Sequence, residues 1–155
     1  MANTYTQINI HAVFAVKGRE NVISEKFSDE LFKYISGILS KQGQYPLAVG
    51  GYKDHVHIFY EMTTTITVAK ILEEVKSSST AWINQNQFVT GKFSWQKGYG
   101  AFSYSKSQRN DVIQYIKNQK QHHSIKIFRE EYREMLKNFD VNFEDAYLFE
   151  FYDDI

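Results

Sequence analysis

The fold is decided by one stretch of the chain, LAVGGYKDHVHIFYEM at residues 47–62. It predicts two short strands, 47–52 and 55–62, joined by a tight turn into a hairpin. Side chains at positions i and i+2 of a strand lie on the same face of a sheet. We therefore expect His55 and His57 to point to one face, while the apolar residues between and after them point to the opposite, helix-covered face.

The flanking segments extend this hairpin into a longer pattern. Residues 4–16 alternate polar and apolar side chains and then run apolar, as a central strand does. A helix is predicted after Ser24, with apolar residues at spacings of three and four, and Gly43 ends it. A second helix starts at Thr67, and residues 93–105 read as a turn followed by a strand.

The element order is thus strand-helix-strand-strand-helix-strand, followed by helices over 108–121, with Ser107 as N-cap, and over 125–137. This order predicts an α+β, ferredoxin-like (split βαβ) antiparallel sheet with two helices on one face. We expect the other face to be uncovered and open to a ligand or a second subunit. The chain, 1–155, is interpreted as one domain whose acidic C-terminal tail, 140–155, packs against the body.

Composition excludes several classes of protein. The chain has 155 residues, is 43% hydrophobic and contains no cysteine, which excludes a disulfide scaffold and thiolate zinc sites. It has no apolar run of about 18 residues that could span a bilayer and no secretory signal. We therefore expect a cytoplasmic protein with no membrane partner.

The charges are balanced in total but unevenly distributed. The tail holds six acidic residues and no basic one, so the other 139 residues carry 18 basic against 12 acidic side chains, a net charge of +6. Between Lys92 and Lys126, Asp111 is the one acidic residue, and aromatic residues are interleaved with seven basic ones: Lys92, Lys97, Lys106, Arg109, Lys117, Lys120 and Lys126. This pattern suits a polyanion with stackable bases, although a solvated lysine face over core aromatics is the more common explanation.

Three histidines on predicted strands are candidate site residues. The imidazoles of His55 and His57 lie one strand step apart, and such a pair can chelate a divalent cation. Paired surface histidines are also common without a metal. His11 is expected to be a hydrogen-bonded sheet residue, or else to face a nucleic acid.

The predicted third helix supplies a second set of candidates. Tyr115 and Gln119 are four residues apart and therefore share one helix face. His122 and His123 lie on the same face one turn later. Tyr115 is either a half-buried tyrosine on an amphipathic helix or a nucleophile beside polar metal ligands, and spacing does not decide between them. If it is a nucleophile, its basic neighbours Arg109, Lys117 and Lys120 are expected to favour the phenolate. The two histidines fit the carbonyl end of the helix or the metal site.

The chain resembles the single-tyrosine HUH transposases of insertion sequences, where HUH means His-hydrophobic-His. Five stretches carry this resemblance: IHAVFAVKGR (10–19), DHVHIF (54–59), KSSSTAWIN (76–84), FSWQKGYGAFSYS (93–105) and YIKNQKQHH (115–123). The resemblance implies that His55 and His57 bind the metal, that Gln119 is a further ligand and that Tyr115 is the nucleophile. Mg²⁺ or Mn²⁺ suits such ligands.

The same resemblance implies an activity and partners. The protein would cleave and rejoin single-stranded DNA at mobile-element ends through a 5′-phosphotyrosine intermediate, recognise DNA hairpins there, and associate with the nucleoid. A homodimer is expected, and the tyrosine could act within its own subunit or in the other one. Candidate DNA-binding residues are Lys97, Lys106, Arg109, Lys117, Lys120 and His11. The alternative is a non-catalytic or domesticated hairpin-binding protein with the same fold, since ferredoxin-like sheets also bind single strands.

Overall fold

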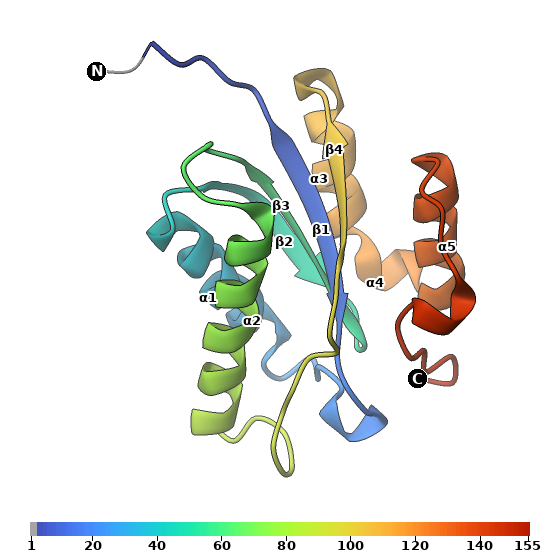
Figure 1. Cartoon of the computed structure of the whole chain (residues 1–155). Coiled ribbons are helices and arrows are strands. Elements are labelled where there is room, and N and C mark those ends of the chain that lie inside the picture. Colours follow the sequence, from blue (N-terminus) through green and yellow to red (C-terminus); the bar gives the residue numbers. More distant parts are fainter. Residues whose placement is uncertain (1–2) are drawn as a thin grey trace.

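The structure is a computed structural model that describes residues 3–155. A four-stranded antiparallel sheet in the order β2-β3-β1-β4 forms its centre (Figure 1). The strands are β1 (Asn9–Ala15), β2 (Tyr45–Gly51), β3 (His55–Glu61) and β4 (Gly100–Tyr104). Because β3 is antiparallel to both of its neighbours, β1 and β2 run parallel with β3 inserted between them. This is the split βαβ topology, and the predicted α+β, ferredoxin-like class is confirmed.

Two helices cover one face of the sheet: α1 (Ser28–Lys41) and α2 (Val68–Gln85). Thr67 caps α2 as predicted, because its side-chain oxygen accepts a hydrogen bond from the Lys70 backbone N–H. Gly43, at φ +79°, follows the end of α1. The helices enclose an apolar core made with one set of strand side chains, and both tryptophans, Trp82 and Trp95, lie on this side.

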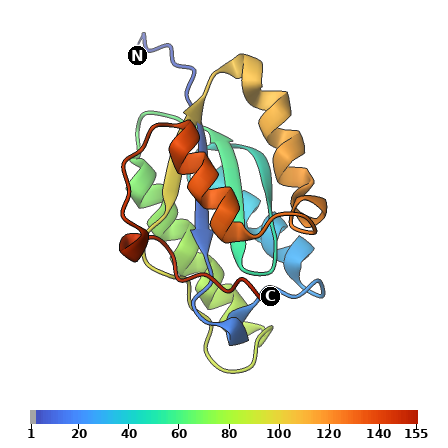
Figure 2. The ribbon, with the colours of Figure 1, turned by 90° about the vertical axis from the view of Figure 1, so that its right-hand side faces the viewer.

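The opposite face is covered as well, which corrects the expectation of an open face. The helices α3 (Arg109–Lys117), α4 (Gln119–His122) and α5 (Phe128–Asn138) lie on it (Figure 2). The cause is the apolar stripe of α5, which buries four residues against the sheet: Phe128, Tyr132, Met135 and Leu136. An amphipathic helix of this kind must bury its stripe, and the sheet face is the surface it uses.

Two details of the third predicted helix are also corrected. Ser107 is not the N-cap: a 3₁₀ turn over Lys106–Gln108 precedes α3, Ser105 caps this turn in a capping box with Gln108, and Gln108 is the N-cap residue of α3 itself. The helix is not continuous to residue 121. It ends at Lys117, and Asn118, a poor helix former, turns the chain before α4 begins at Gln119.

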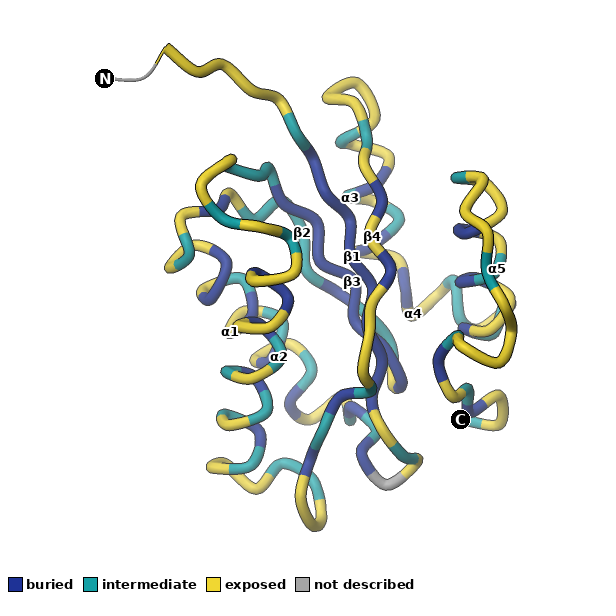
Figure 3. The backbone as a smooth tube through the Cα atoms, in the orientation of Figure 1, coloured by how far each residue is buried: buried dark blue, intermediate teal, exposed yellow. Residues whose placement is uncertain are grey.

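The C-terminal tail packs against the body, as expected. Phe149 is buried beside the Tyr132 ring, with their centroids 5.0 Å apart, and the Tyr152 hydroxyl accepts a 2.6 Å hydrogen bond from the Gly18 backbone N–H. In the burial-coloured view, β1 is dark blue along its whole length (Figure 3). Because β1 lies inside the sheet, it cannot pair with a second subunit, and only β2 and β4 offer strand edges. Within residues 3–155, no helix has both the length and the apolar character needed to cross a membrane.

Two glycines let the second layer of helices approach the sheet closely. A Cβ atom on Gly50 of β2 would lie 2.8 Å from the Ile116 carbonyl oxygen of α3. A Cβ atom on Gly100 of β4 would lie 2.6 Å from the Tyr132 hydroxyl of α5. Larger residues at these positions would therefore push α3 and α5 away from the strands.

Candidate active site and metal centre

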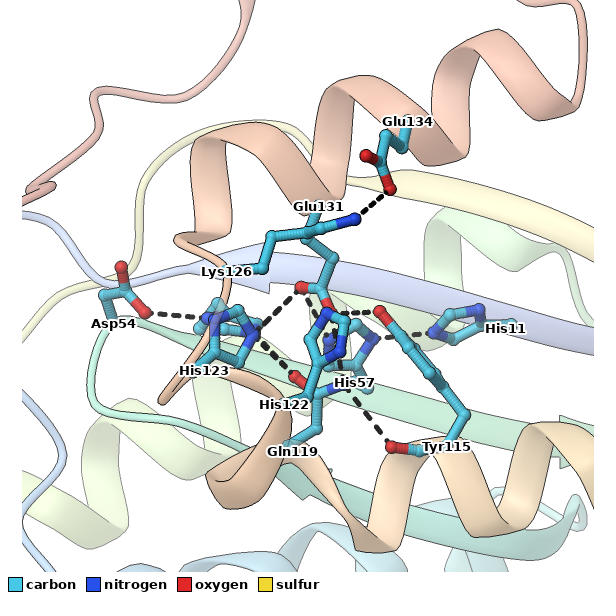
Figure 4. A network of polar contacts seen from close by, with 11 residues as sticks. His11, Asp54, His57, Tyr115, Gln119, His122, His123, Lys126, Glu131 and Glu134 are labelled. Carbon is cyan, nitrogen blue, oxygen red and sulfur yellow. Dashed lines mark hydrogen bonds and ion pairs between the residues drawn. The ribbon is translucent and has the colours of Figure 1, made fainter.

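All five histidines of the chain gather on the α3–α5 side of the sheet (Figure 4). His11 comes from β1, and His55 and His57 come from β3, on the face away from α1 and α2, as predicted. The other two, His122 and His123, come from the end of α4. His11, His55 and His57 are at most 1% exposed, so they form a buried cluster rather than a surface pair.

His55 and His57 are each held through Nδ1. His55 Nδ1 lies 2.7 Å from Asp54 Oδ1, and His57 Nδ1 lies 2.7 Å from His11 Nε2. When Nδ1 donates to such an acceptor, Nε2 is the ring nitrogen that can bind a cation in place of a proton, which is how metal-binding histidines are usually oriented. His11 therefore positions His57 from within the cluster rather than lying on the molecular surface.

The two imidazoles differ in their proton affinity. Burial by itself lowers the pKa of His55, but the Asp54 and Glu131 carboxylates outweigh burial and raise this pKa to about 9. Burial lowers the pKa of His57. The Glu131 carboxylate opposes this effect but does not outweigh it, and the neighbouring His55 and His123 rings lower the pKa further. His57 is thus held as a neutral imidazole, the form that binds metal ions.

Gln119 reaches the cluster despite the helix break. Its Oε1 lies 3.0 Å from His55 Nε2 and 2.9 Å from His123 Nε2, and can accept a hydrogen bond from each. Its Nε2 donates to Glu131 Oε2 over 3.1 Å. The side chain is 1% exposed, so this amide is an internal part of the site.

Tyr115 joins the cluster from α3. Its hydroxyl donates a hydrogen bond to Glu131, and its ring meets the His57 ring edge-on, with centroids 5.7 Å apart. Tyr115 and His122 line a pocket of about 260 Å³ between α3 and α5. The cluster therefore opens to the outside beside the Tyr115 hydroxyl.

The prediction that Tyr115 is a phenolate is wrong, as the groups around its hydroxyl show. Burial, followed by the Glu131 carboxylate, raises the pKa of Tyr115 above its ordinary value. Two of its three predicted cationic partners are engaged elsewhere, because Arg109 donates to Asn9, Gln7 and Glu61, and Lys120 pairs with Glu25. The third, Lys117, is exposed. Tyr115 therefore rests as a neutral phenol.

Glu131 on α5 is the site residue that the sequence did not predict. Its Oε1 lies 3.3 Å from the Nε2 atoms of His55 and His57 and 3.2 Å from His123 Nε2. Burial alone would raise the pKa of this carboxyl, but His57, His123 and His55 lower it, so Glu131 is ionised. One signal in the sequence could have found it: an acidic residue on the apolar stripe between Phe128 and Tyr132.

The buried residues fit a divalent cation. His57 Nε2 is buried and has no hydrogen-bond partner among residues 3–155, which is costly unless something binds it. His55 Nε2 and Gln119 Oε1 lie beside it as nitrogen and oxygen donors. Imidazole nitrogen with amide oxygen suits Mn²⁺, and it accepts Mg²⁺ less readily. These residues can therefore hold the group that the resemblance implies.

Of the residues predicted to bind DNA, His11 is buried inside this cluster and is not available to DNA in the way predicted. The lysines and Arg109 lie outside the cluster. Lys97, Lys106 and Lys117 are exposed on the surface, whereas Arg109 is half-buried and fixed by its three partners. Lys117 and Lys120 line one side of a groove of about 570 Å³ next to β2. The surface lysines stay available for an anionic ligand, while Arg109 connects α3 to the start of β1.

Two solved structures share the fold of this chain. A protein named as a candidate transposase from Deinococcus radiodurans R1 has a similar structure, with a TM-score of 0.57 and 21% identity over 77% of this chain and 95% of that chain. A REP-associated tyrosine transposase bound to a REP hairpin gives a TM-score of 0.56 and 12% identity over 79% of this chain and 73% of that chain. With sequence identities of only 21% and 12%, these two similarities establish the fold of the chain and nothing more specific.

The sequence comparison is more specific. No curated protein sequence matches the chain. The family model described as "Transposase IS200 like" matches residues 4–119, which include both β3 histidines, Tyr115 and Gln119. Since the matched residues make up well over half of the chain, this protein belongs to the IS200-like transposase family.

Proposed function

We propose that this transposase cleaves and rejoins single-stranded DNA with Tyr115 as the nucleophile and with a divalent cation held by His55, His57 and Gln119. One observation carries the proposal. The Tyr115 hydroxyl, the Gln119 amide and the two β3 imidazoles converge on one buried carboxylate, although they come from three separate elements. A protein that only binds hairpins has no need for such a cluster.

The proposed reaction is a reversible transfer to tyrosine. The Tyr115 oxygen attacks the phosphorus of a DNA phosphodiester, the bond from phosphorus to the 3′-oxygen breaks, and a 5′-phosphotyrosine and a free 3′-OH result. Because a phenolate is a moderate leaving group, a 3′-OH can later reverse the link. Glu131 Oε2 accepts the hydrogen bond from the Tyr115 hydroxyl and so orients the attacking oxygen. The phenol gives up its proton as its oxygen bonds to phosphorus, and the departing 3′-oxygen takes up a proton.

The pocket itself explains the need for a cation. Three carboxylates line it, those of Asp111, Glu131 and Glu134, and they would repel a phosphodiester. When bound, the cation offsets charge on the non-bridging phosphate oxygens and orients the phosphate. His55 and His57 are held through Asp54 and His11, so their Nε2 atoms keep a fixed direction.

The proposed substrate is single-stranded DNA with a hairpin near the element end. Support comes from the structurally similar REP-associated transposase, which is bound to a REP hairpin, and from exposed lysines, with Lys106 and Lys117 at the start and end of the α3 region and Lys97 in the loop before β4. A homodimer would have to form through the edge of β2 or β4 or through the outer helix faces. Nucleoid association would follow from DNA binding.

The test is a search for the covalent intermediate. Wild-type protein is incubated with Mn²⁺ and single-stranded oligonucleotides copied from the DNA on either side of its coding region. We expect an adduct that survives denaturing electrophoresis, with the nucleotide located on Tyr115 by mass spectrometry. Tyr115→Phe removes one oxygen, keeps the ring and should form no adduct. Tyr104→Phe is the matched control, because Tyr104 lines the same pocket, and it should react like the wild type.

Two outcomes would reject the proposal. Adduct formation by Tyr115→Phe at the wild-type rate would remove Tyr115 as the nucleophile. Tight hairpin binding by the wild type, with no adduct on any flanking oligonucleotide, would favour the non-catalytic hairpin-binding alternative.

A further inference from the structure

We propose that Glu131 of α5 is an anionic ligand of the divalent cation that His55 and His57 bind. The inference rests on the proposed function and extends it, because Glu131 lies beyond residues 4–119, the part of the chain that the family model matches. The C-terminal helix would thus complete a metal site whose other ligands lie within the matched part.

The geometry of Glu131 suits this role (Figure 4). His55 Nε2, His57 Nε2 and one Glu131 carboxylate oxygen all lie within 4.8 Å of one another. Two of these atoms, His57 Nε2 and Glu131 Oε1, are buried and face each other over 3.3 Å without forming a well-directed hydrogen bond within the described chain. A cation shared by the three side chains would give both atoms the partner they lack.

Charge balance points to the same residue. Two imidazoles and the Gln119 amide are neutral ligands, and a doubly charged cation at a fully buried site needs a nearby anion. Asp54 is the other carboxylate in contact with the pair, but it bonds Nδ1 of His55, on the side of the ring away from the cluster. Glu131, only 2% exposed, is the carboxylate that faces the Nε2 atoms.

The two oxygens of Glu131 have separate partners. Oε1 faces the imidazoles, while Oε2 accepts hydrogen bonds from the Tyr115 hydroxyl and the Gln119 amide. The carboxylate therefore fixes the position of the nucleophile relative to the cation.

Helix α5 is held firmly enough to place a ligand. Phe128 stacks on the His55 ring, with the centroids 3.9 Å apart and the planes 2° from parallel. One turn later Tyr132 packs against the glycine backbone of β4. Glu131 lies between these two anchors on the same helix, so its side chain has little freedom to leave the cluster.

The experiment measures Mn²⁺ binding by the full chain without DNA, by titration calorimetry or by the electron paramagnetic resonance of free Mn²⁺. We expect the wild type to bind and Glu131→Gln to bind at least tenfold more weakly. Glu130→Gln is the matched control, since Glu130 is its exposed neighbour and the change in charge is the same. It should bind within twofold of the wild type. Circular dichroism and hairpin affinity verify that each variant is folded.

Glu131→Asp serves as the second variant, because it keeps the charge and withdraws the carboxylate by one methylene. A direct ligand should lose affinity in this variant too, and wild-type binding by Glu131→Asp would overturn direct ligation. Wild-type Mn²⁺ affinity in Glu131→Gln would overturn the inference and leave the proposed function standing. If the wild type bound no Mn²⁺ while His57→Ala behaved identically, the proposed metal site and the role of Glu131 would both be rejected.

Discussion

The two faces of the sheet are built from the same strands and differ in almost every property. Toward α1 and α2, strand β3 presents Val56, Ile58 and Tyr60, all fully buried in an apolar core. Toward α3–α5, the alternate residues His55 and His57 are buried just as deeply among polar groups. Burial of the first kind stabilises the fold, whereas burial of the second kind reduces stability unless every polar group is paired. The comparison shows that β3 keeps both imidazoles on one face by the parity of their positions, although Phe59 on that face still packs in an apolar cluster with Val112 and Ile116.

The largest effect on stability is expected on the apolar face. Ile58→Ala removes three buried carbons from the core and should reduce the free energy of unfolding by about 2–5 kcal/mol. Urea denaturation measures this loss. Because Ile58 points away from the cluster, Mn²⁺ affinity per folded molecule should stay at the wild-type value. If the variant lost stability and metal affinity together, the two faces would not be independent.

A smaller loss of stability, with a larger loss of activity, is expected at the glycine beneath α3. Gly50→Ala places a Cβ atom against Ile116, next to Tyr115. Such overpacking reduces stability by about 1–3 kcal/mol, and it should also slow adduct formation by moving the nucleophile. The control is Gly37→Ala in α1, where no heavy atom of the described chain lies within 4 Å of the added Cβ.

The Gly37→Ala control should gain stability, by about 0.5–1 kcal/mol, because alanine is the better helix former. Thermal melting and the adduct assay measure both variants. Normal adduct formation by Gly50→Ala would mean that the close approach of α3 to β2 does not position Tyr115.

The smallest effect is expected for single surface lysines. Lys117→Gln, two residues after Tyr115, should weaken hairpin binding and reduce the slope of log affinity against log salt by about 0.7, the value for one phosphate contact on a single strand. Lys33→Gln, an exposed lysine of α1 on the opposite side, is the matched control and should leave the slope unchanged. Equal slopes for both variants would mean that DNA does not approach from the α3 side.

The sequence predicts the sheet and the helices α1 and α2 well, and it predicts the packing of α3–α5 on the other face poorly. The alternation in β3 and the Thr67 cap are local signals, and both are found in the structure as predicted. The docking of α5 is a long-range event. Its amphipathic pattern over 125–137 shows which side is buried but does not indicate which surface receives it, so the second sheet face was expected to be open.

In the candidate site, too, the residues set by local spacing were predicted and those set by tertiary packing were not. His55, His57, Tyr115 and Gln119 are all found in the cluster, because spacing within a strand or a helix sets which face each side chain shares. Glu131 depends on tertiary packing, and so does the protonation of Tyr115. Sequence neighbours suggested cations around that hydroxyl, but its actual contact is a carboxylate from another helix.

The location of the tryptophans has a consequence for optical measurements. Trp82 and Trp95 both belong to the α1/α2 side, and Trp95 is fixed by a hydrogen bond from its indole N–H to Ser79 Oγ. Emission from these two indoles therefore reports on one layer of the molecule. Detachment of α5 with the tail still in place would leave that emission unchanged but would alter the helical circular dichroism. The unfolding curves from the two signals would then separate if α5 opens first.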